Sequence, residues 1–531
     1  MKKTLLSVLL IAATHQLTAQ ITLQSTNENI ASNAIGTFQG INYREGGFSG
    51  LHYIQGSNGT EFWTVSDRGV NIDAANANPS ACRPTYDKLY AFPNYAPKIH
   101  KIKIVAGQVD ILETITIKRP NGNPATGIIN PTGFGSTAAE VASTNVVTDC
   151  TQFNNNTVAK DVWGIDSEGI DIDVDGNFWI CEEGGPTIWK VNATGIVLKR
   201  YTPYSQTPQT EDVVIDNCFS YRRNNRGFEG ITVTPNGKIY AIIQSPMYYK
   251  NVNGSAASGS LTNSRIHRLL EIDPITNTTR MFAYVNDGAV GTSSDIRPSD
   301  QKVGDLKAIN NTTFLIIEQA ARGSQNVKKM YTIDINAATP VFSGLSYSSG
   351  TKTLEELENP SNLTSNGITA VTKTLLFDLQ ATGWPIALDK AEGIAIIDAN
   401  TIAICNDNDY GQTSVAQDGI ATATTIKSTL FIYKLNGVNA LQNYVPNNNV
   451  LNNAAFADKM NIVTAYPNPF TNNITIENTL ADENYTITDI LGSIVKIGRT
   501  NQFSTIVTLD NLNSGIYFLK LNDRITKIMK Q

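Results

Sequence analysis

Histidine is scarce in this sequence, which holds four in 531 residues. Three of them, His52, His100 and His267, lie beyond the first twenty residues, and none follows an arginine and precedes a glycine as in histidine phosphatases. The stretch Gly47–Gly50 resembles a nucleophile elbow, but Leu51 stands where that motif requires a second glycine. The sequence therefore argues against histidine-phosphatase chemistry and against a Ser-His-Asp hydrolase.

Long apolar runs are also absent. The longest near the N-terminus, Leu5–Ala13, follows Lys2 and Lys3 and precedes a possible cleavage site at Ala19. It is well short of the roughly 20 residues that span a bilayer. We therefore predict that residues 1–20 are a signal peptide, that the protein is exported, and that it has no membrane span.

Positive charge is in deficit, since the formal net charge is −6. A mildly acidic chain has little attraction for nucleic acid or for an anionic membrane, and we expect neither as a partner.

Cysteine is scarce too, and the five cysteines are an odd number, so at least one thiol stays unpaired. Cys181 and Cys405 lie in apolar strand patterns, which predicts that they are buried. Cys82, Cys150 and Cys218 lie in loop-like sequence and are the candidates for a disulfide, although the sequence does not determine their pairing.

The C-terminal part of the chain differs in composition from the rest. Residues 438–460 are rich in asparagine, which is typical of a linker. Residues 461–531 alternate apolar and polar residues between turns, which predicts a small β-sandwich.

This last segment resembles the C-terminal sorting domain of proteins exported by the type IX secretion system. The resemblance rests on Tyr466–Pro469, on the Asp489–Gly492 turn, on Ser514–Tyr517 and on the tail with Lys527 and Lys530. It implies that the secretion machinery is a partner and that the protein passes the outer membrane. The expected destination is the cell surface or the medium.

A repeated unit fills most of the remaining chain. Each copy has a strand that starts at an acidic or small residue, a turn with glycine or asparagine, and a second strand that ends in polar residues. The copies are Gly46–Gly69, Asp166–Gly185, Gly227–Pro246, Val303–Gly323 and Lys390–Gly411. The wide gap after the first copy leaves room for one more unit, with Lys98–Ile117 as its outer hairpin. Six units predict an all-β fold, a six-bladed β-propeller that closes near Lys434.

Acidic residues recur at both ends of the repeated hairpins. By strand parity Glu168 shares one side with Ile170 and Ile172, and Glu229 shares one side with Ile231, so each Glu should open its strand from the core-facing side. Because a hairpin returns the chain to the same edge, the polar ends should meet at one mouth of the channel. The predicted ring holds Glu168, Glu182, Glu183, Glu229, Glu318, Glu392, Asp407 and Asp409, with Arg68, Arg226, Arg322 and Lys390 between them.

So many carboxylates around one channel favour a bound cation, and oxygen ligands suit Ca²⁺. A set of solvated rim charges and ion pairs is the alternative. Asp171, Asp173, Asp175, Gly176 and Glu182 also fit an EF-hand loop, but their flanks alternate as strands do.

Five segments follow one another along the chain: GGFSGL with VSDRG, DSEGIDI with CEEG, GFEGI, GDLKAI with FLIIEQ, and KAEGIAI with CNDNDYG. In this order they resemble the phytase-like family, which is described as having the esterase-like activity of phytase. The resemblance covers about residues 36–434 and implies an exported six-bladed propeller, which we assign to residues 21–437. The sequence departs from alkaline propeller phytases because it has no Asp-Asp-Pro-Ala motif, and Gln244 and Gln319 stand where ionic residues are expected.

These observations lead to one main hypothesis, a calcium-assisted phosphoesterase that acts on a phosphate ester or another anionic small molecule. Its predicted metal ligands are Glu168, Glu229, Glu392 and Asp407. Its predicted substrate-binding residues are Arg68, Arg226 and Lys390, and its predicted catalytic residues are Glu182, Glu229 and Glu318. The alternatives are a non-catalytic binding propeller with structural calcium, and a lactonase or carboxylic esterase.

Overall fold

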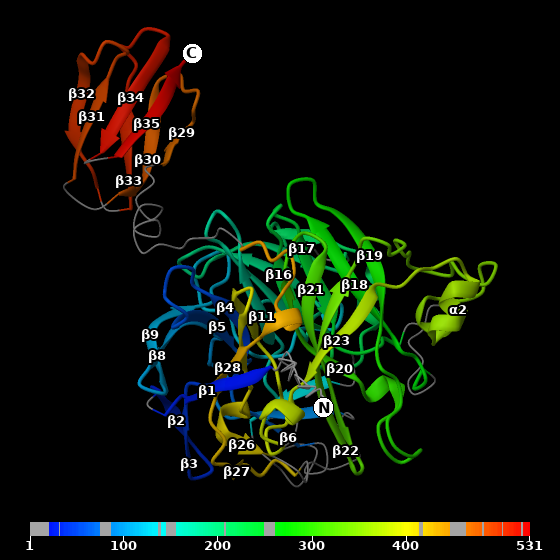
Figure 1. Cartoon of the computed structure of the whole chain (residues 1–531). Coiled ribbons are helices and arrows are strands. Elements are labelled where there is room, and N and C mark those ends of the chain that lie inside the picture. The colour runs from blue at the N-terminus through cyan, green and yellow to red at the C-terminus, as the bar shows by residue number, and fades with distance from the viewer. Residues whose placement is uncertain are drawn as a thin grey trace, which may run out of the picture. The chain divides into compact units, whose positions relative to one another are not determined.

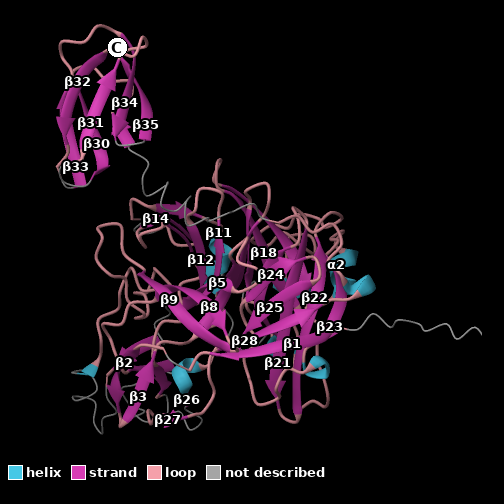
Figure 2. Cartoon of the chain, turned by 60° about the vertical axis from the view of Figure 1, so that its left-hand side comes forward, coloured by secondary structure: helices cyan, strands magenta, loops and turns pink. Residues whose placement is uncertain are grey.

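Strands in mostly antiparallel sheets are the main secondary structure of the computed structural model (Figures 1 and 2). The structure describes residues 21–30, 32–74, 86–135, 140–144, 156–205, 209–248, 261–413, 418–446, 464–479, 483–501, 503–521 and 524–531. They fall into two compact units, which divide between residues 449 and 450. The predicted signal peptide, Cys82, Cys150 and residues 447–460 of the predicted linker lie outside the described residues.

Five groups of strands in the larger unit share one pattern, in which four strands follow one another outward from an innermost strand. We call each group a sheet, although a pairing of Glu28 with Gln108 joins the first and fifth groups into one eight-stranded sheet. The first sheet has β4 (Phe48–Tyr53), β5 (Glu61–Ser66), β8 (Lys98–Val105) and β9 (Gln108–Thr116). The second has β11 (Ser167–Ile172), β12 (Phe178–Glu182), β13 (Ile188–Val191) and β14 (Val197–Thr202), with β15 (Asp212–Val214) added at its edge. The third has β16 (Phe228–Val233), β17 (Ile239–Ile243), β18 (Ile266–Asp273) and β19 (Thr278–Val285).

The fourth sheet has β20 (Lys302–Ala308), β21 (Thr313–Arg322), β22 (Gln325–Asp334) and β23 (Thr372–Asp378). The fifth has β24 (Ile394–Asp398), β25 (Thr401–Cys405), β28 (Thr429–Lys434) and β1 (Thr22–Glu28). Because β1 pairs antiparallel with β28, strands from the two ends of this unit complete the same sheet.

The innermost strands contact one another in the order β4, β11, β16, β20 and β24, and β24 returns to β4. Glycine permits this close approach. A Cβ on Gly230 of β16 would lie 2.4 Å from the backbone nitrogen of Leu306 on β20. At the closing junction, Gly393 donates its backbone N–H to the carbonyl of Ser49 at 3.0 Å. The ring of sheets around a central channel is the arrangement of a β-propeller.

The prediction of six blades is wrong for the described residues, which form five sheets around this ring. Lys98–Ile117 does not start a blade of its own, because β8 pairs with β5 and β9 pairs with β8. The extra length after the first repeat instead contributes a separate three-stranded sheet of β6 (Asn71–Asp73), β7 (Tyr86–Tyr90) and β10 (Glu140–Ser143). Two short hairpins complete the irregular parts, β2 (Ala34–Phe38) with β3 (Ile41–Arg44), and β26 (Gln412–Thr413) with β27 (Thr422–Ala423).

A β-bulge at the start of the innermost strands overturns the parity prediction. In the second and third sheets the register shifts between Ser167 and Gly169 and between Phe228 and Gly230, so an extra residue falls at each anchor Glu. Ile231 accordingly packs in the core between sheets, whereas Glu229 lies among other carboxylates. The anchor Glu and the isoleucines that follow it do not share one environment.

Further along the same strands, a polar cluster links four of the five innermost strands. Asp171 of β11 accepts from Thr232 of β16 at 2.8 Å and lies 2.5 Å from Nδ1 of His52 on β4. Lys307 of β20 donates to the carbonyls of Ile170 and Ile231 at 2.8 and 3.3 Å. These contacts join β4, β11, β16 and β20 to one another.

Three cysteines lie within the described residues. Cys181, Cys218 and Cys405 are all buried with free thiols, as predicted for Cys181 and Cys405. The prediction that Cys218 forms a disulfide is wrong, because its thiol packs against Met281 in the core.

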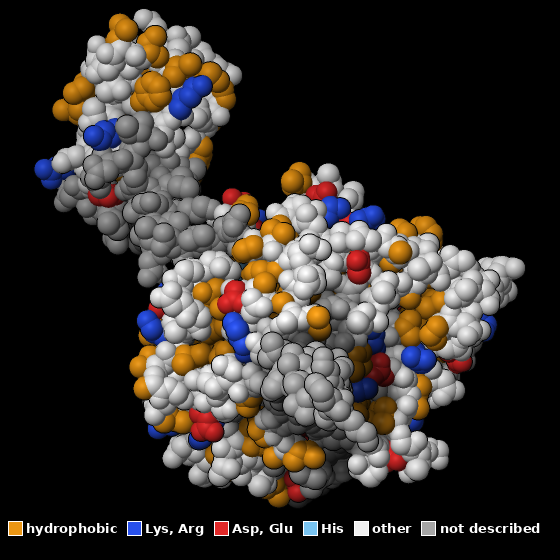
Figure 3. All heavy atoms as spheres, in the orientation of Figure 1, with side chains coloured by type: hydrophobic (Ala, Val, Ile, Leu, Met, Phe, Trp, Pro, Cys, Tyr) orange, Lys and Arg blue, Asp and Glu red, His pale blue; other side chains and the backbone are white. Residues whose placement is uncertain are grey.

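The C-terminal unit has two antiparallel sheets. One has β29 (Thr464–Tyr466), β30 (Asn473–Thr479) and β33 (Phe503–Thr508), and the other has β32 (Ile494–Arg499), β31 (Asn484–Thr488), β34 (Gly515–Leu521) and β35 (Arg524–Lys530). Both contribute to one apolar core, in which Ile474 and Ile476 of the first sheet join Ile487 and Leu519 of the second. Apolar side chains also lie on the outside of this unit (Figure 3).

Helices are few and short. The one α-helix among the described residues, α2 (Pro360–Ser365), lies between β22 and β23. No helix of the described chain has the length and apolar character that crossing a membrane requires.

Candidate metal centre and anion pocket

The densest group of carboxylates lies where β11 and β16 begin and β12 ends. Glu168 stands at the start of β11, Glu229 at the start of β16, and Glu183 directly after β12. One oxygen from each of the three lies within 4.8 Å of the other two. All three side chains are buried, and Glu229 is only 2% exposed. The bulges described above turn both anchor carboxylates toward this point.

These three carboxylates have polar neighbours, and the cations near them, Arg68, Lys302 and Lys390, act on them from beyond ion-pair distance. Glu183 accepts hydrogen bonds from the amides of Asn225 and, at 3.3 Å, of Gln244. Within the described chain no Lys or Arg forms an ion pair with any of the three. Oε2 of Glu229 has no hydrogen-bond partner.

Burial and mutual repulsion make the ionised forms of these carboxyl groups unfavourable. Burial, followed by the charges of Glu229 and Glu183, raises the pKa of Glu168 well above its usual value. Burial and Glu183 likewise raise the pKa of Glu229. Buried like charges at such short range are costly unless they are protonated or share a cation. The residues present therefore fit an oxygen-liganded divalent ion such as Ca²⁺.

Two further groups of carboxylates form a chain with the first, since one shares Glu168 with it and the other shares Asp67 with that second group. Asp67, Asp166 and Glu168 form one, and Asp67, Asp407 and Asp409 form the other. In the first of these Asp166 is ion-paired with Arg68, which also donates to Tyr90 at 2.9 Å and to Asn225 at 2.8 Å.

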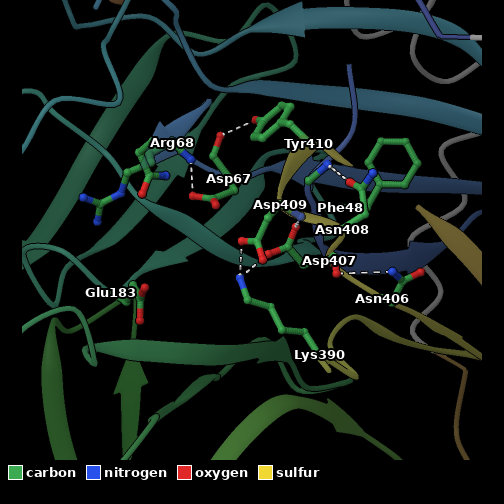
Figure 4. Close-up of polar contacts among 12 residues, drawn as sticks. Phe48, Asp67, Arg68, Glu183, Lys390, Asn406, Asp407, Asn408, Asp409 and Tyr410 are labelled. Atoms are coloured by element: carbon green, nitrogen blue, oxygen red, sulfur yellow. Dashed lines mark hydrogen bonds and ion pairs between the residues drawn. The ribbon is translucent and has the colours of Figure 1, made fainter. Parts of the chain in front are cut away.

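In the other group Lys390 forms ion pairs with both Asp407 and Asp409, the latter at 2.8 Å (Figure 4). Burial alone would lower the pKa of Lys390, but Asp407 and Asp409 raise it well above its usual value, so the amine stays charged. Both of these groups thus already contain a cation.

The loop that carries Asp407 and Asp409 has unfavourable backbone dihedral angles and is fixed by a hydrogen bond from a buried tyrosine. Asp409 and Tyr410 have φ of 45° and 56°, in the left-handed region that is unfavourable for residues other than glycine. The Tyr410 hydroxyl donates to the carbonyl of Asp67 at 2.8 Å (Figure 4). This contact ties the last repeat to the first at the mouth of the channel.

A basic pocket of about 190 Å³ lies beside the carboxylates. Its lining includes four cations, Arg226, Lys302, Arg322 and Lys390, and three acids, Asp300, Asp389 and Glu392. Arg322 pairs with Asp300 at 2.9 Å and Lys390 with Asp407, whereas Arg226 donates to Ser245 at 3.1 Å.

Two of these cations have no carboxylate partner within ion-pair distance among the described residues, namely Arg226 and Lys302. Burial, and then the nearby charge of Arg223, lowers the pKa of Arg226 to about 10. Burial and Arg226 lower the pKa of Lys302. Two desolvated cations side by side favour an anionic ligand.

The structure thus brings together most of the residues that the sequence singles out. Glu168 and Glu229 belong to the first carboxylate group, Asp407 and Lys390 pair with each other, and Arg68 joins two groups. Arg226 and Glu392 line the basic pocket, and Oε2 of Glu392 has no hydrogen-bond partner. Glu392 belongs to none of the three carboxylate groups.

Two predicted catalytic residues lie outside the three carboxylate groups, although Oε2 of Glu182 accepts from the backbone N–H of Asp166 at 3.4 Å. Glu182 accepts from the Gly185 backbone at 2.6 Å and from Thr187 at 3.0 Å, within the turn after its own strand. Glu318 accepts from Tyr284 at 2.5 Å and from Lys373 at 2.7 Å, within the third and fourth sheets. Hydrogen bonds within the fold therefore satisfy both carboxylates.

The sequence did not point to Asp166, Asn225 or Lys302. Asp166 stands two residues before the anchor Glu168, and that position inside the repeat was an available clue. Lys302 starts β20 two residues before Gly304, in a copy that lacks the anchor Glu. Asn225 lies in a loop that no repeat covers.

The EF-hand alternative is wrong. Two strands rather than helices flank the loop, and Oδ1 of Asp173 accepts the backbone N–H groups of Asp175 and Asn177, both at 2.9 Å. Its Oδ2 accepts from Trp179 at 3.1 Å and pairs with Lys190 at 2.9 Å. Hydrogen-bond donors therefore satisfy Asp173.

Comparisons with known proteins agree with both parts of the chain. Residues 44–410 match the family model "Phytase-like: Esterase-like activity of phytase". Residues 464–531 match the model "Secretion system C-terminal sorting domain". The chain is therefore a protein of the type IX secretion pathway, exported to the cell surface or secreted.

An uncharacterized secreted protein of Arthroderma benhamiae is 25% identical over 309 residues, which are 51% of this chain and 57% of that protein. The chain thus matches little more than half the length of this relative.

Solved structures give weaker likenesses. PorZ, a surface component of the type IX secretion system of Porphyromonas gingivalis, is 10% identical with a TM-score of 0.27, over 93% of this chain and 61% of PorZ. An aldose sugar dehydrogenase of Streptomyces coelicolor is 10% identical with a TM-score of 0.29, over 78% of this chain and 98% of that enzyme. Scores this low carry no argument about fold or activity.

Proposed function

Because the chain belongs to the phytase-like family, we propose that it is an exported, calcium-assisted phosphoesterase that acts at the mouth of its propeller channel. One observation carries the proposal. Three buried carboxylates with no Lys or Arg of the described residues within ion-pair distance lie near a pocket lined by two desolvated cations, Arg226 and Lys302, which likewise have no carboxylate within that distance. A site for a metal and a site for an anionic group are thereby adjacent.

On the acidic side, Glu168, Glu183 and Glu229 hold the metal. Carboxylate oxygens are the ligands that Ca²⁺ prefers. When bound, the ion supplies a Lewis acid for a phosphoryl oxygen. Asn225 and Gln244 orient Glu183 through their amides.

On the basic side, Arg226 and Lys302 bind the phosphate group of the ester. The Arg guanidinium matches phosphate geometry, and the buried Lys contributes a compact charge. Glu392 lines the same pocket with one oxygen unpartnered, and it is the carboxyl group placed to exchange a proton with the substrate.

We assign this activity to residues 21–437. Residues 1–20 act as the signal peptide, residues 438–460 as the linker and residues 461–531 as the sorting domain. The match of residues 464–531 to the sorting-domain family supports the last of these assignments.

The test is phosphate release from p-nitrophenyl phosphate by the full chain, with Ca²⁺ or with EGTA. We expect turnover that EGTA abolishes and that Glu229→Gln lowers by about 100-fold, as loss of a group that stabilises charge does in other enzymes. Glu113→Gln, on the exposed face of β9, is the matched control and should leave the rate unchanged.

Activity that persists in EGTA would overturn the calcium assignment. Hydrolysis of a lactone or a carboxylic ester but not of the phosphate would change the substrate class. Calcium binding without turnover of any ester would instead identify a binding propeller with structural calcium.

A further inference from the structure

The three carboxylate groups at the mouth form a chain through shared members. Glu168 belongs to the first and second groups, and Asp67 belongs to the second and third. In each group, one oxygen atom from each of three carboxylates lies close to the other two. The three groups differ in whether a Lys or Arg side chain balances the negative charge of their carboxylates.

In the second group the positive charge comes from Arg68. Its ion pair with Asp166 is almost fully buried, with side-chain exposures of 3% and 4%. Tyr90 and Asn225 accept its other N–H groups and hold the guanidinium in place. An added cation would have to displace a well-anchored arginine.

In the third group the positive charge comes from Lys390. Its ammonium lies between Asp407 and Asp409, which point toward it from the same loop (Figure 4). Asp409 also donates its backbone N–H to Oδ1 of Asp407 at 2.8 Å, which fixes the two acids relative to each other. The ammonium group of Lys390 thus occupies the position where a second metal ion would bind.

In the first group no Lys or Arg of the described residues lies within ion-pair distance, and Arg68, Lys302 and Lys390 act on it only from farther away. No ion pair reaches Glu168, Glu183 or Glu229 in the described portion of the chain. Glu229 is 2% exposed, and its Oε2 is without a hydrogen-bond partner in the same group of oxygens. That unpartnered atom is an observation independent of the clustering, and it points to a ligand here.

We propose that the mouth binds one divalent cation, at Glu168, Glu183 and Glu229, and that Arg68 and Lys390 are built-in cations which keep the other two carboxylate groups from binding metal. The inference rests on the metal site of the proposed function, which it deepens by fixing the number of ions and their place. It also gives Lys390 a role as a substitute for a metal instead of a direct substrate contact.

The test is the number of Ca²⁺ ions bound per chain, measured on the full chain by calorimetric titration and by elemental analysis after dialysis. The wild-type protein should bind one ion, and Glu229→Gln should bind none. Lys390→Met should bind two, because it leaves Asp67, Asp407 and Asp409 without a counter-charge. Lys390→Arg should restore the count of one.

Lys427→Met, an exposed lysine near the end of the same repeat, is the matched control and should also bind one ion. A wild-type count of two or more would overturn the proposal, and so would a Lys390→Met count that stays at one in a protein with a cooperative melting transition. If Lys390→Met does not fold, the wild-type count still decides.

The measurement uses no substrate, so its result is separate from the fate of the phosphoesterase proposal. One bound ion without turnover would leave this inference standing and remove the proposed activity. Turnover with several bound ions would do the reverse.

Discussion

Arg268 and Glu355 form a bidentate ion pair in which neither side chain has any exposed surface. Nε and Nη2 of Arg268 donate to the two carboxylate oxygens at 2.6 and 3.0 Å. Arg268 lies on β18, and Glu355 starts the 3₁₀ helix η3 (Glu355–Leu357) in the long connection between β22 and β23. The pair therefore fastens that connection to the third sheet.

The first prediction follows from the burial of this pair. Glu355→Leu removes the carboxylate that balances the buried charge of Arg268 and should lower the free energy of unfolding by about 3–5 kcal/mol. The double variant Arg268→Met with Glu355→Leu should recover most of that loss, because no buried charge remains. Urea titration of both variants measures the difference, and equal losses in the two would contradict the argument.

The second prediction concerns His267, which is buried and neutral. Its Nδ1–H donates to the carbonyl of Ile243 at 3.1 Å, and its Nε2 accepts from the amide of Asn286 at 3.1 Å. Burial lowers its pKa to about 3, against about 6.5 in an unfolded chain. Between these values the unfolded state binds a proton that the folded state does not, so stability should fall as the pH falls from 6.5 toward 3.

The measurement is the free energy of unfolding as a function of pH for the wild type and for His267→Gln. The wild type should lose more stability than the variant on acidification, by up to about 1.4 kcal/mol per pH unit in this range. Parallel curves for the two proteins would show that His267 is protonated in the folded state.

The repeat pattern predicts the inner ring of strands correctly. Ser49, Glu168, Glu229 and Leu306 lie in β4, β11, β16 and β20, and Glu392 stands just before β24. The Glu-Gly pairs repeat because a glycine is needed where neighbouring innermost strands approach most closely. The same pattern miscounts the blades, because spacing alone does not distinguish a new blade from a sheet inserted within one.

The directions in which the side chains point could not be predicted from the sequence. Strand parity assumes an unbroken pleat, and a bulge at the anchor breaks it. Glu182 and Glu183 are adjacent and equally plausible in sequence, yet Glu183 joins the carboxylate group and Glu182 bonds to its own turn. Contacts between repeats determine which carboxylates are ion-paired with a Lys or an Arg. Residue types alone do not reveal these contacts.

The third prediction tests ring closure through Gly230. Alanine there would place a Cβ 2.4 Å from the backbone nitrogen of Leu306, and backbone on both sides prevents relief by a side-chain movement. Gly230→Ala should lower the free energy of unfolding of the larger unit by about 1–3 kcal/mol or more.

Its control is Gly515→Ala, whose added Cβ would meet its nearest atom at 3.9 Å. Thermal unfolding followed by calorimetry compares the two variants. Equal melting temperatures for Gly230→Ala and the wild type would mean that the innermost strands are not packed as closely as described.

The fourth prediction uses the opposite signs of two effects at Glu229. Without calcium, Glu229→Gln removes one of three buried like charges, so the variant should be at least as stable as the wild type. With Ca²⁺ at 100 times its dissociation constant, the wild type should gain about 2.7 kcal/mol, because the ion binds only the folded state. The variant loses a ligand and should gain little.

The order of melting temperatures in EGTA should therefore be reversed in calcium, whereas Glu113→Gln should follow the wild type in both. A variant that is destabilised in EGTA yet gains as much from calcium as the wild type would show that Glu229 is a structural hydrogen-bond acceptor instead of a metal ligand.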